Sequence, residues 1–540
     1  MAGARVSILK GVRAGRDAIV RSGAVVSKDV ASRDTLPEIR RGGLVPPMPD
    51  ILKASLKVGV ATLAGLLGWV VAGKILAITL GAAGVGLFGL LRQLLQNLAL
   101  IGSLNGQQAL VQGIASRTTR STQLRFAGSV FHLQVLLGGV LAVGLLVFAP
   151  WLGPWLIPHS KSVTLLRWLA LVMLVTVAQA YVIGLLNGHR LINALVKSQM
   201  LSPVAVLLLV FPMVWLVRRG YPFGFVLMLG GPAAVTTIAA AWLARQATWM
   251  PPMWGWKIDR SDALGFFRMS AVLLISGVVT TGAQFFESWL VARRMGLAEA
   301  GQFWTAWAIS MSYVTLVLGS LGSYYMPSLS RLADPEARRL LIRSYLGLSL
   351  IAMPVIASLV IVVKPWIIRG MFSPALLPAL KVMRWMLIGD FFKGLAWVLA
   401  FPMLALNDMK WFFWSEVGFS FGMAGAAWLW LSRRGSIEGL GLIFMLLYMV
   451  YLLVMVIYIR ARHGFVWRSG EAGQFVVGLA LVVLLSVLTW RDNQVKWLPV
   501  GLFTLLGGAY LLFNIGRSGW HGLHSLGESV SGKPFHGTEV

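Results

Sequence analysis

The strongest constraint on this chain is a series of apolar blocks, each about 20 residues long, separated by short polar gaps. A helix needs roughly 20 apolar residues to cross the ~30 Å hydrocarbon core of a bilayer. Only 12% of the residues are charged, whereas a soluble domain carries roughly 25%. A soluble fold would also need other segments to cover every block, and few residues remain for that. We therefore expect a protein that crosses the membrane many times.

The blocks predict about 14 transmembrane helices, of which the last two are short. The fold class is therefore an all-α polytopic membrane protein. The expected spans are 58–80, 84–114, 126–149, 163–186, 192–217, 222–243, 266–292, 302–326, 341–363, 377–406, 412–431, 440–459, 475–489 and 498–513.

The charge pattern predicts the orientation of these helices. The net charge is +28, which in a soluble chain would suggest nucleic-acid binding. In a membrane protein, basic loops face the cytoplasm and its anionic lipids. Basic residues are more numerous on the side of residues 1–50, so both termini are expected in the cytoplasm. Cysteine is absent, which excludes disulfides and thiolate chemistry. No cofactor or metal is expected.

A faint internal repeat predicts two similar halves. Gly81, Gly86 and Phe88 lie between the first two spans, and at one constant offset Gly296, Gly301 and Phe303 lie between the seventh and eighth. The segment 101–104 is likewise echoed by 318–321. Such parallel repeats predict a substrate cavity between the two halves.

The resulting segments are defined by the spans. They are a cytoplasmic extension (1–50), a first lobe of six helices (51–248), a second lobe of six (249–463), two extra helices (464–515) and a polar tail (516–540). Within 1–30, small apolar residues recur every six positions, which resembles the last coils of hexapeptide-repeat acyltransferases. Fewer than two coils cannot form a domain, so this stretch is interpreted as a remnant or, alternatively, as a basic tail.

Four stretches together resemble a known transporter family. "GKILAITLGAAGVGLFGLLRQLL" near the amino end is followed in order by "YYMPSLSRL", "GDFFKGLAW" and "WSEVGFSF". The ordered set is similar to bacterial Wzx-type flippases, which move lipid-linked oligosaccharides of the O-antigen or enterobacterial common antigen, and it covers about residues 52–460. The resemblance implies the multidrug/oligosaccharidyl-lipid/polysaccharide exporter fold, with two six-helix lobes around a central cavity. It also implies a place in the bacterial inner membrane and a polyprenyl-diphosphate-linked substrate, with other polysaccharide-assembly membrane proteins as candidate partners.

One polar stripe in the second span predicts a binding surface. Arg92 is followed by Gln93, Gln96 and Asn97, mostly at helical spacings, on an otherwise apolar helix. A guanidinium pairs with phosphate oxygens in a two-pronged geometry. The alternative is a structural arginine that binds helix-end carbonyls.

Other intramembrane charges are weaker candidates. The resemblance implies that Lys74 of the first span, at a position basic in the family, contacts the diphosphate, although its stem is also long enough to reach the interface. Glu287 of the seventh span is a candidate for a coupling cation or proton, or a partner for a nearby arginine. Asp390 and Lys393 are expected to form an ion pair with each other.

Two other function classes remain open. A drug or cation antiporter on the same fold needs paired carboxylates within one lobe, and this sequence has few. A membrane enzyme of polysaccharide assembly needs charged residues in a large external loop, and the expected external loops are short. A transporter rather than an enzyme is therefore expected.

Overall fold

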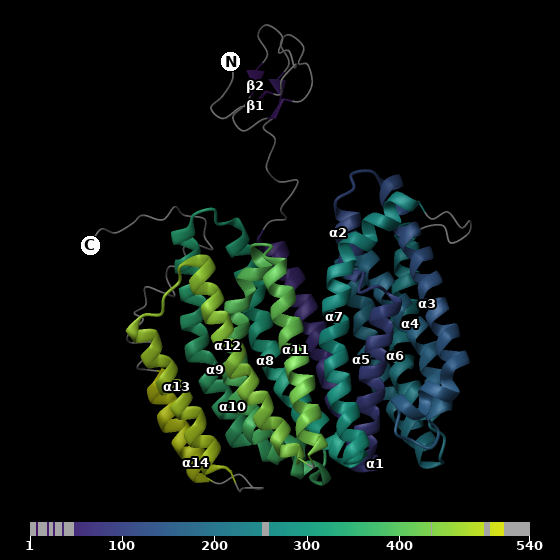
Figure 1. Cartoon of the computed structure of the whole chain (residues 1–540). Coiled ribbons are helices and arrows are strands. Elements are labelled where there is room, and N and C mark those ends of the chain that lie inside the picture. The colour runs from purple at the N-terminus through teal and green to yellow at the C-terminus, as the bar shows by residue number, and fades with distance from the viewer. Residues whose placement is uncertain are drawn as a thin grey trace. The chain divides into compact units, whose positions relative to one another are not determined.

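The computed structural model describes residues 48–250, 259–433, 435–490 and 497–511, together with four two-residue strands nearer the amino terminus. Its bulk is a set of long helices that run roughly side by side (Figure 1). The helices are α1 (Met48–Gly102), α2 (Gln107–Ala115), α3 (Arg120–Leu156), α4 (Ser162–Gly188), α5 (Ile192–Arg218), α6 (Phe223–Gln246), α7 (Arg260–Arg294), α8 (Leu297–Arg331), α9 (Pro335–Met371), α10 (Leu380–Ala405), α11 (Met409–Ser432), α12 (Ile437–His463), α13 (Ser469–Leu488) and α14 (Trp497–Leu502), with a 3₁₀ turn η2 (Pro374–Ala379) and a π-helical turn η3 (Phe503–Gly507).

Ten helices in the described part of the chain are long and apolar enough to cross a membrane. The expected all-α membrane fold is therefore confirmed. α1 counts once among the ten, although two spans were expected there. It has non-helical backbone at Gly81 (φ 66°, ψ −167°) and so consists of two helices. At the carboxyl end, the apolar helix that covers the last expected span is short.

The chain divides into two compact units, Met1–Ala64 and Gly65–Val540. In the first, Ser7–Ile8 (β1) pairs in parallel with Val25–Val26 (β3), three six-residue repeats further on, as one coil of a hexapeptide β-helix requires. Ile19–Val20 (β2) pairs with Thr35–Leu36 (β4) at a shorter offset. Residues 48–50 of the 1–50 extension begin α1, and apart from these strands the rest of the extension and the 516–540 tail lie outside the described residues.

Within Gly65–Val540, the helices form two groups. In the first half, α3 packs on α4, and both α4 and α5 pack on α6. In the second half, α10 packs on α8, α9 and α12, and α13 covers α9. α7 lies between the groups, because it contacts α2 and α3 on one side and α11 on the other (Figure 1).

The glycines of the internal repeat meet across the interface between the halves. A methyl group on Gly86 would overlap the carbonyl oxygen of Leu297 and lie 2.7 Å from the amide nitrogen of Gly301. A methyl group on Gly301 would overlap the carbonyl oxygen of Ala82 and lie 3.0 Å from the amide nitrogen of Gly86. Each half thus presents the same residues to the other, as a two-fold axis requires. We call this contact the glycine crossing.

The two junctions that lead into the crossing are also equivalent. Gly81 and Gly296 both have positive φ, 66° and 115°, and each precedes a helix by one residue. This conformation favours glycine because a Cβ is disfavoured there. The second echo is different. Segment 101–104 leads into a non-helical turn at Leu104 and Asn105, whereas 318–321 stays inside α8.

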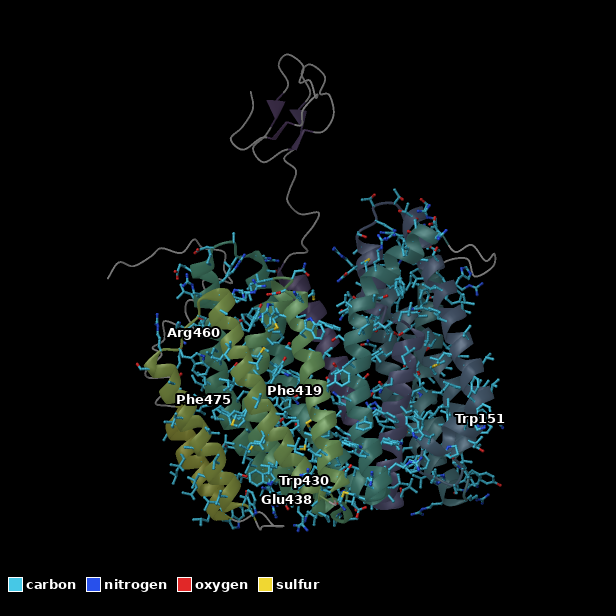
Figure 2. The ribbon with its side chains drawn as sticks, in the orientation of Figure 1. Trp151, Phe419, Trp430, Glu438, Arg460 and Phe475 are labelled. Carbon is cyan, nitrogen blue, oxygen red and sulfur yellow. The ribbon has the colours of Figure 1, made fainter. Side chains whose placement is uncertain are left out.

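Large aromatic side chains lie on the outer surface near helix ends. Trp151 in α3 is 75% exposed, and Trp430 in α11 is also exposed. Figure 2 shows Glu438 and Arg460 at opposite ends of α12, with Trp430 close to the Glu438 end. Charged side chains at the ends, with tryptophans near them, are typical of membrane–water interfaces.

Candidate functional site: a cavity between the halves

A cavity of about 590 Å³ lies between the two halves. One wall is formed by α1 with α5 and α6, and the other by α7, α8 and α9. The lining is mostly apolar and rich in aromatic rings, but it includes a small polar group from both halves. The polar and aromatic lining residues are Trp69, Phe88, Arg92, Gln93, Gln96, Gln284, Trp304, Trp307, Ser312, Tyr313 and Phe372.

Arg92 provides the only charge among the described residues that line this cavity. It lies on the helical part of α1 that follows Gly81, and its guanidinium carbon is 4.7 Å from the centre of the Trp69 ring. Stacking on an aromatic face fixes the plane of a guanidinium while its N–H donors at the edge stay available. The arginine is therefore oriented by packing and not by a carboxylate.

Side chains beside Arg92 extend the polar surface. Gln93 is only 6% exposed, and its Oε1 has no hydrogen-bond partner in the described structure. Gln96, one turn further on, is exposed to the cavity, and Gln284 of α7 contributes another amide. Amide groups both donate and accept hydrogen bonds, so they suit hydroxyl-rich ligands.

The opposite wall is aromatic rather than basic. Trp304, Trp307 and Tyr313 of α8 line the cavity, and Trp304 packs closely over Gly89, whose missing side chain leaves room for the indole. The described lining residues from α8 include no arginine or lysine. Flat, largely apolar rings therefore form the wall opposite Arg92.

Two predicted site residues make contacts to other helices instead of lining the cavity. Lys74 donates a hydrogen bond through Nζ to the carbonyl oxygen of Arg369, near the end of α9. Asn97 donates to the carbonyl of Thr281 (3.1 Å) and accepts from its hydroxyl (2.8 Å). In this conformation both residues connect helices, and their assignment to ligand binding stays a prediction.

Glu287 is buried in α7, with 2% of its surface exposed. Its Oε2 has no hydrogen-bond partner among the described residues, and neither has the hydroxyl of Ser288. It does not line the cavity. A carboxylate in this setting is costly to keep ionised, so the residue is a candidate for proton binding.

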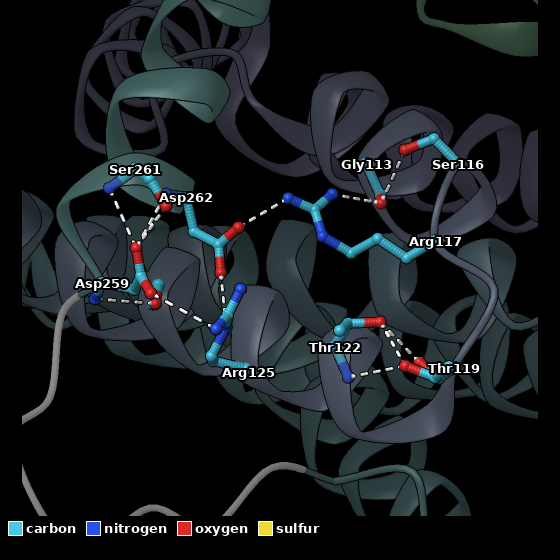
Figure 3. A network of polar contacts seen from close by, with 10 residues as sticks. Gly113, Ser116, Arg117, Thr119, Thr122, Arg125, Asp259, Ser261 and Asp262 are labelled. Carbon is cyan, nitrogen blue, oxygen red and sulfur yellow. Dashed lines mark hydrogen bonds and ion pairs between the residues drawn. The ribbon is translucent and has the colours of Figure 1, made fainter.

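α7 is fastened to the first half at several levels along its length. At its start, Asp262 accepts from Arg117 (2.6 Å) and Arg125 (3.2 Å), as Figure 3 shows. Further along, Asn105 donates to the carbonyl of Leu273 (2.8 Å). At its far end, Trp289 donates to the carbonyl of Trp155 (2.7 Å).

The helix start also carries its own cap. Asp259 accepts hydrogen bonds from the hydroxyl and amide of Ser261 (2.5 and 2.9 Å), and the amide of Asp262 is within reach (Figure 3). These bonds, with the nearby Arg125 charge, hold the pKa of Asp259 below its usual value. The cap therefore stays ionised at neutral pH.

Comparison with known proteins relates this architecture to transporters. The chain is 24% identical over 414 residues to the lipid III flippase of Escherichia coli (strain K12), covering 74% of this chain and 96% of that protein. The lipid II flippase MurJ in an inward closed conformation matches with a TM-score of 0.68 and 12% identity, covering 87% and 99% of the two chains. An inward-facing multidrug resistance MATE family transporter matches with a TM-score of 0.60 and 14% identity, covering 75% and 94%.

These likenesses confirm the expected exporter fold with two pseudo-symmetric lobes. The family model described as "Polysaccharide biosynthesis protein" matches residues 56–333, which is just over half of the chain. The matched range includes Arg92, the glycine crossing and every described part of the cavity lining except that from α9 and Phe372. The chain therefore belongs to the polysaccharide biosynthesis protein family.

Proposed function

We propose that this protein moves a polyprenyl-diphosphate-linked oligosaccharide from the cytoplasmic to the outer face of the bacterial inner membrane. The observation that carries the proposal is Arg92, a single cation stacked on Trp69 in a cavity between two transmembrane lobes. Family membership and similarity to a lipid III flippase support it. O-antigen or related polysaccharide assembly is the process that such a substrate serves.

The chemistry of the substrate explains the cavity. A diphosphate cannot enter hydrocarbon unassisted, because an unpaired buried charge is prohibitively costly. Arg92 offers an oriented fork of donors for phosphate oxygens. The amides of Gln93 and Gln96 suit sugar hydroxyls, while the indole rings of α8 suit the apolar faces of sugar rings. The lipid tail remains in the bilayer throughout, so no covalent chemistry is required.

The other predicted residues have supporting roles in this proposal. Lys74 is assigned to the phosphates through the two N–H bonds that are not used in its contact to the carbonyl oxygen of Arg369. Asn97 keeps the polar helix against α7 through Thr281. Glu287 is assigned to proton binding behind the wall and not to direct contact with the sugar. Both termini face the cytoplasm, as the distribution of basic residues predicts.

A cation antiporter is the alternative, since the fold also matches a multidrug transporter. A cationic substrate needs a carboxylate in the cavity to balance its charge. The described lining residues include an arginine and no carboxylate, which favours an anionic substrate.

The test is transport of a defined polyprenyl-diphosphate sugar in proteoliposomes. Arg92→Ala is expected to abolish flipping, and Arg92→Lys to weaken it, because lysine keeps the charge but loses the fork. Arg219→Ala is a matched control. Arg219 is also stacked on a tryptophan, Trp215, at 4.0 Å, but it is exposed and lies outside the cavity. Flipping by Arg92→Ala at the control rate, with normal folding, contradicts the assignment.

A further inference from the structure

A buried ion pair lies directly behind the aromatic wall of the cavity. Asp390 and Lys393 of α10 both have no exposed surface, and Lys393 Nζ is 3.9 Å from Asp390 Oδ1. This separation is too long for a hydrogen bond. A fully buried pair in a membrane helix is expensive unless its geometry is excellent. Structural pairing alone therefore explains this arrangement poorly.

Asp390 takes its hydrogen bonds from α8 instead of from the lysine. The hydroxyl of Ser310 donates to Oδ1 (2.7 Å), and the hydroxyl of Tyr313 donates to Oδ2 (2.8 Å). The Tyr313 ring lines the cavity. One side chain thus connects the ligand space with the buried carboxylate.

Lys393 is stabilised independently of Asp390. Its Nζ lies between 5.2 and 5.7 Å from the centres of four aromatic rings, those of Trp307, Trp397, Phe444 and Tyr448. It also contacts Sδ of Met311 at 2.7 Å. Faces of aromatic rings attract a cation, so this cage offsets part of the cost of burying the ammonium.

The groups around the pair come from every helix packed on α10. α8 provides Ser310 and Tyr313, and α12 provides Tyr448, which interacts electrostatically with Asp390 and with two further carboxylates, Glu287 of α7 and Glu416 of α11. Glu416 accepts a hydrogen bond from Tyr451 (2.9 Å). α9 and α13 contribute apolar contacts, through Met353 against Gly394 and Phe475 against Phe391.

We propose that the Asp390–Lys393 pair is a proton-binding site linked to the cavity, and that binding of an anionic diphosphate lipid takes up a proton on Asp390. The net charge of the pair depends on this proton. With Asp390 ionised the pair is neutral, and one proton added to its carboxylate leaves the caged ammonium uncompensated. A positive pair behind the wall favours an anion in the cavity, and Tyr313 is released from an ionised acceptor at the same time. The inference rests on the proposed function, because the ligand is that of the Arg92 site.

Reciprocal linkage makes this testable at equilibrium. If ligand binding takes up one proton, then affinity must rise as pH falls, by up to about tenfold per pH unit. Asp390→Asn imitates the protonated state and cannot take up the proton. It is expected to bind well at every pH, with no uptake. Tyr313→Phe keeps the ring but removes one donor to the carboxylate, so its pH dependence is expected to move to higher pH.

The experiment uses the purified full chain in nanodiscs with farnesyl diphosphate as the probe. Affinity is measured between pH 7.5 and 9, where the diphosphate itself is largely ionised, and proton uptake is followed with a pH indicator in weak buffer. Glu438→Gln is the matched control, because Glu438 pairs with Arg384 on the same helix α10 (3.5 Å) but away from the cavity. It is expected to behave as the wild type does.

The outcomes separate this inference from the proposed function. No binding of the probe by the wild type overturns the proposed function itself. Binding without pH dependence, or a pH dependence that survives in Asp390→Asn, overturns the proton site alone. If binding at constant pH depends on sodium, and Asp390→Asn abolishes that dependence, then the site binds sodium and the proposal of a proton is wrong. If Asp390→Asn does not fold, the test rests on Tyr313→Phe. A pH dependence of affinity that is the same in Tyr313→Phe as in the wild type then refutes the linkage.

Discussion

The glycine crossing predicts how the conformational equilibrium responds to a single methyl group. In the structure, a Cβ at residue 301 overlaps the carbonyl of Ala82 and lies 3.0 Å from the amide nitrogen of Gly86, whereas ordinary contact begins at 3.4 Å. The nearest atoms are backbone and cannot rotate away. Gly301→Ala therefore forces the two helices apart. Overpacking of this kind costs about 1–3 kcal/mol, which corresponds to a roughly 5- to 150-fold change in a two-state equilibrium.

The crossing lies beside the turns at Gly81 and Gly296, which the orientation prediction places at the outer face. We therefore expect Gly301→Ala to depopulate the state in which the cavity is closed at the outer face, and to favour the state in which it is open there. Because the chain has no cysteine, Ser312→Cys on the cavity wall is a background-free reporter. An impermeant maleimide should label it more from outside and less from inside in the Gly301→Ala protein.

The control for this prediction is Gly144→Ala. A methyl group on Gly144 has no atom within 4 Å, and alanine suits a helix better than glycine does. It should leave the sidedness of labelling unchanged. If Gly301→Ala, normally expressed, labels as the control does, then the crossing does not close the cavity.

Three further predictions concern orientation, the amino-terminal extension and the ties of α7. Cysteines introduced at Ala333 and Ser160, both exposed, should label from opposite sides, and labelling from the same side contradicts the topology. Deletion of residues 1–45 should leave insertion and complementation intact, since they match no part of the family; loss of function at normal abundance shows otherwise. Asp262→Asn weakens charge-assisted bonds to two arginines, and we expect a loss of about 1–3 kcal/mol, read as a lower melting temperature in detergent. Glu336→Gln, whose partner bond is on the surface, should change little, and equal effects of the two refute the argument.

Local signals in the sequence were sufficient for much of this fold. Apolar blocks mark the helices, because hydrocarbon thickness dictates their length. Gly81 and Gly296 could be matched because a reversal between two spans requires backbone that favours glycine. Similar sequences did not always adopt similar backbone conformations, however. Segment 101–104 leads into a break at Asn105, whose side chain bonds to Leu273 of α7, and no such break interrupts 318–321 in α8.

The candidate site could be read only in part for a related reason. The stripe around Arg92 follows helical periodicity, so it is visible within one segment. The partners of Lys74 and Asn97 are residues far away in the chain, Arg369 and Thr281, and no local pattern identifies them. The cage around Lys393 likewise joins side chains from three helices. Long-range pairings of this kind follow from packing and not from the spacing of residues.

The ties of α7 have a consequence for measuring motion in this protein. By sequence α7 opens the second half, and it packs on α11 of that half. It is nevertheless also bonded to the first half, at Arg117, Asn105 and Trp155. If these hydrogen bonds persist while the halves rock against each other, α7 has to slide along α11 and the chain has to flex where α7 meets α8, at Gly296. Pairs of spin labels on α3 and α7 would then keep a constant separation while pairs on α7 and α8 change theirs. An experiment that took α7 as part of the second half would place the moving joint between α6 and α7, one helix too early.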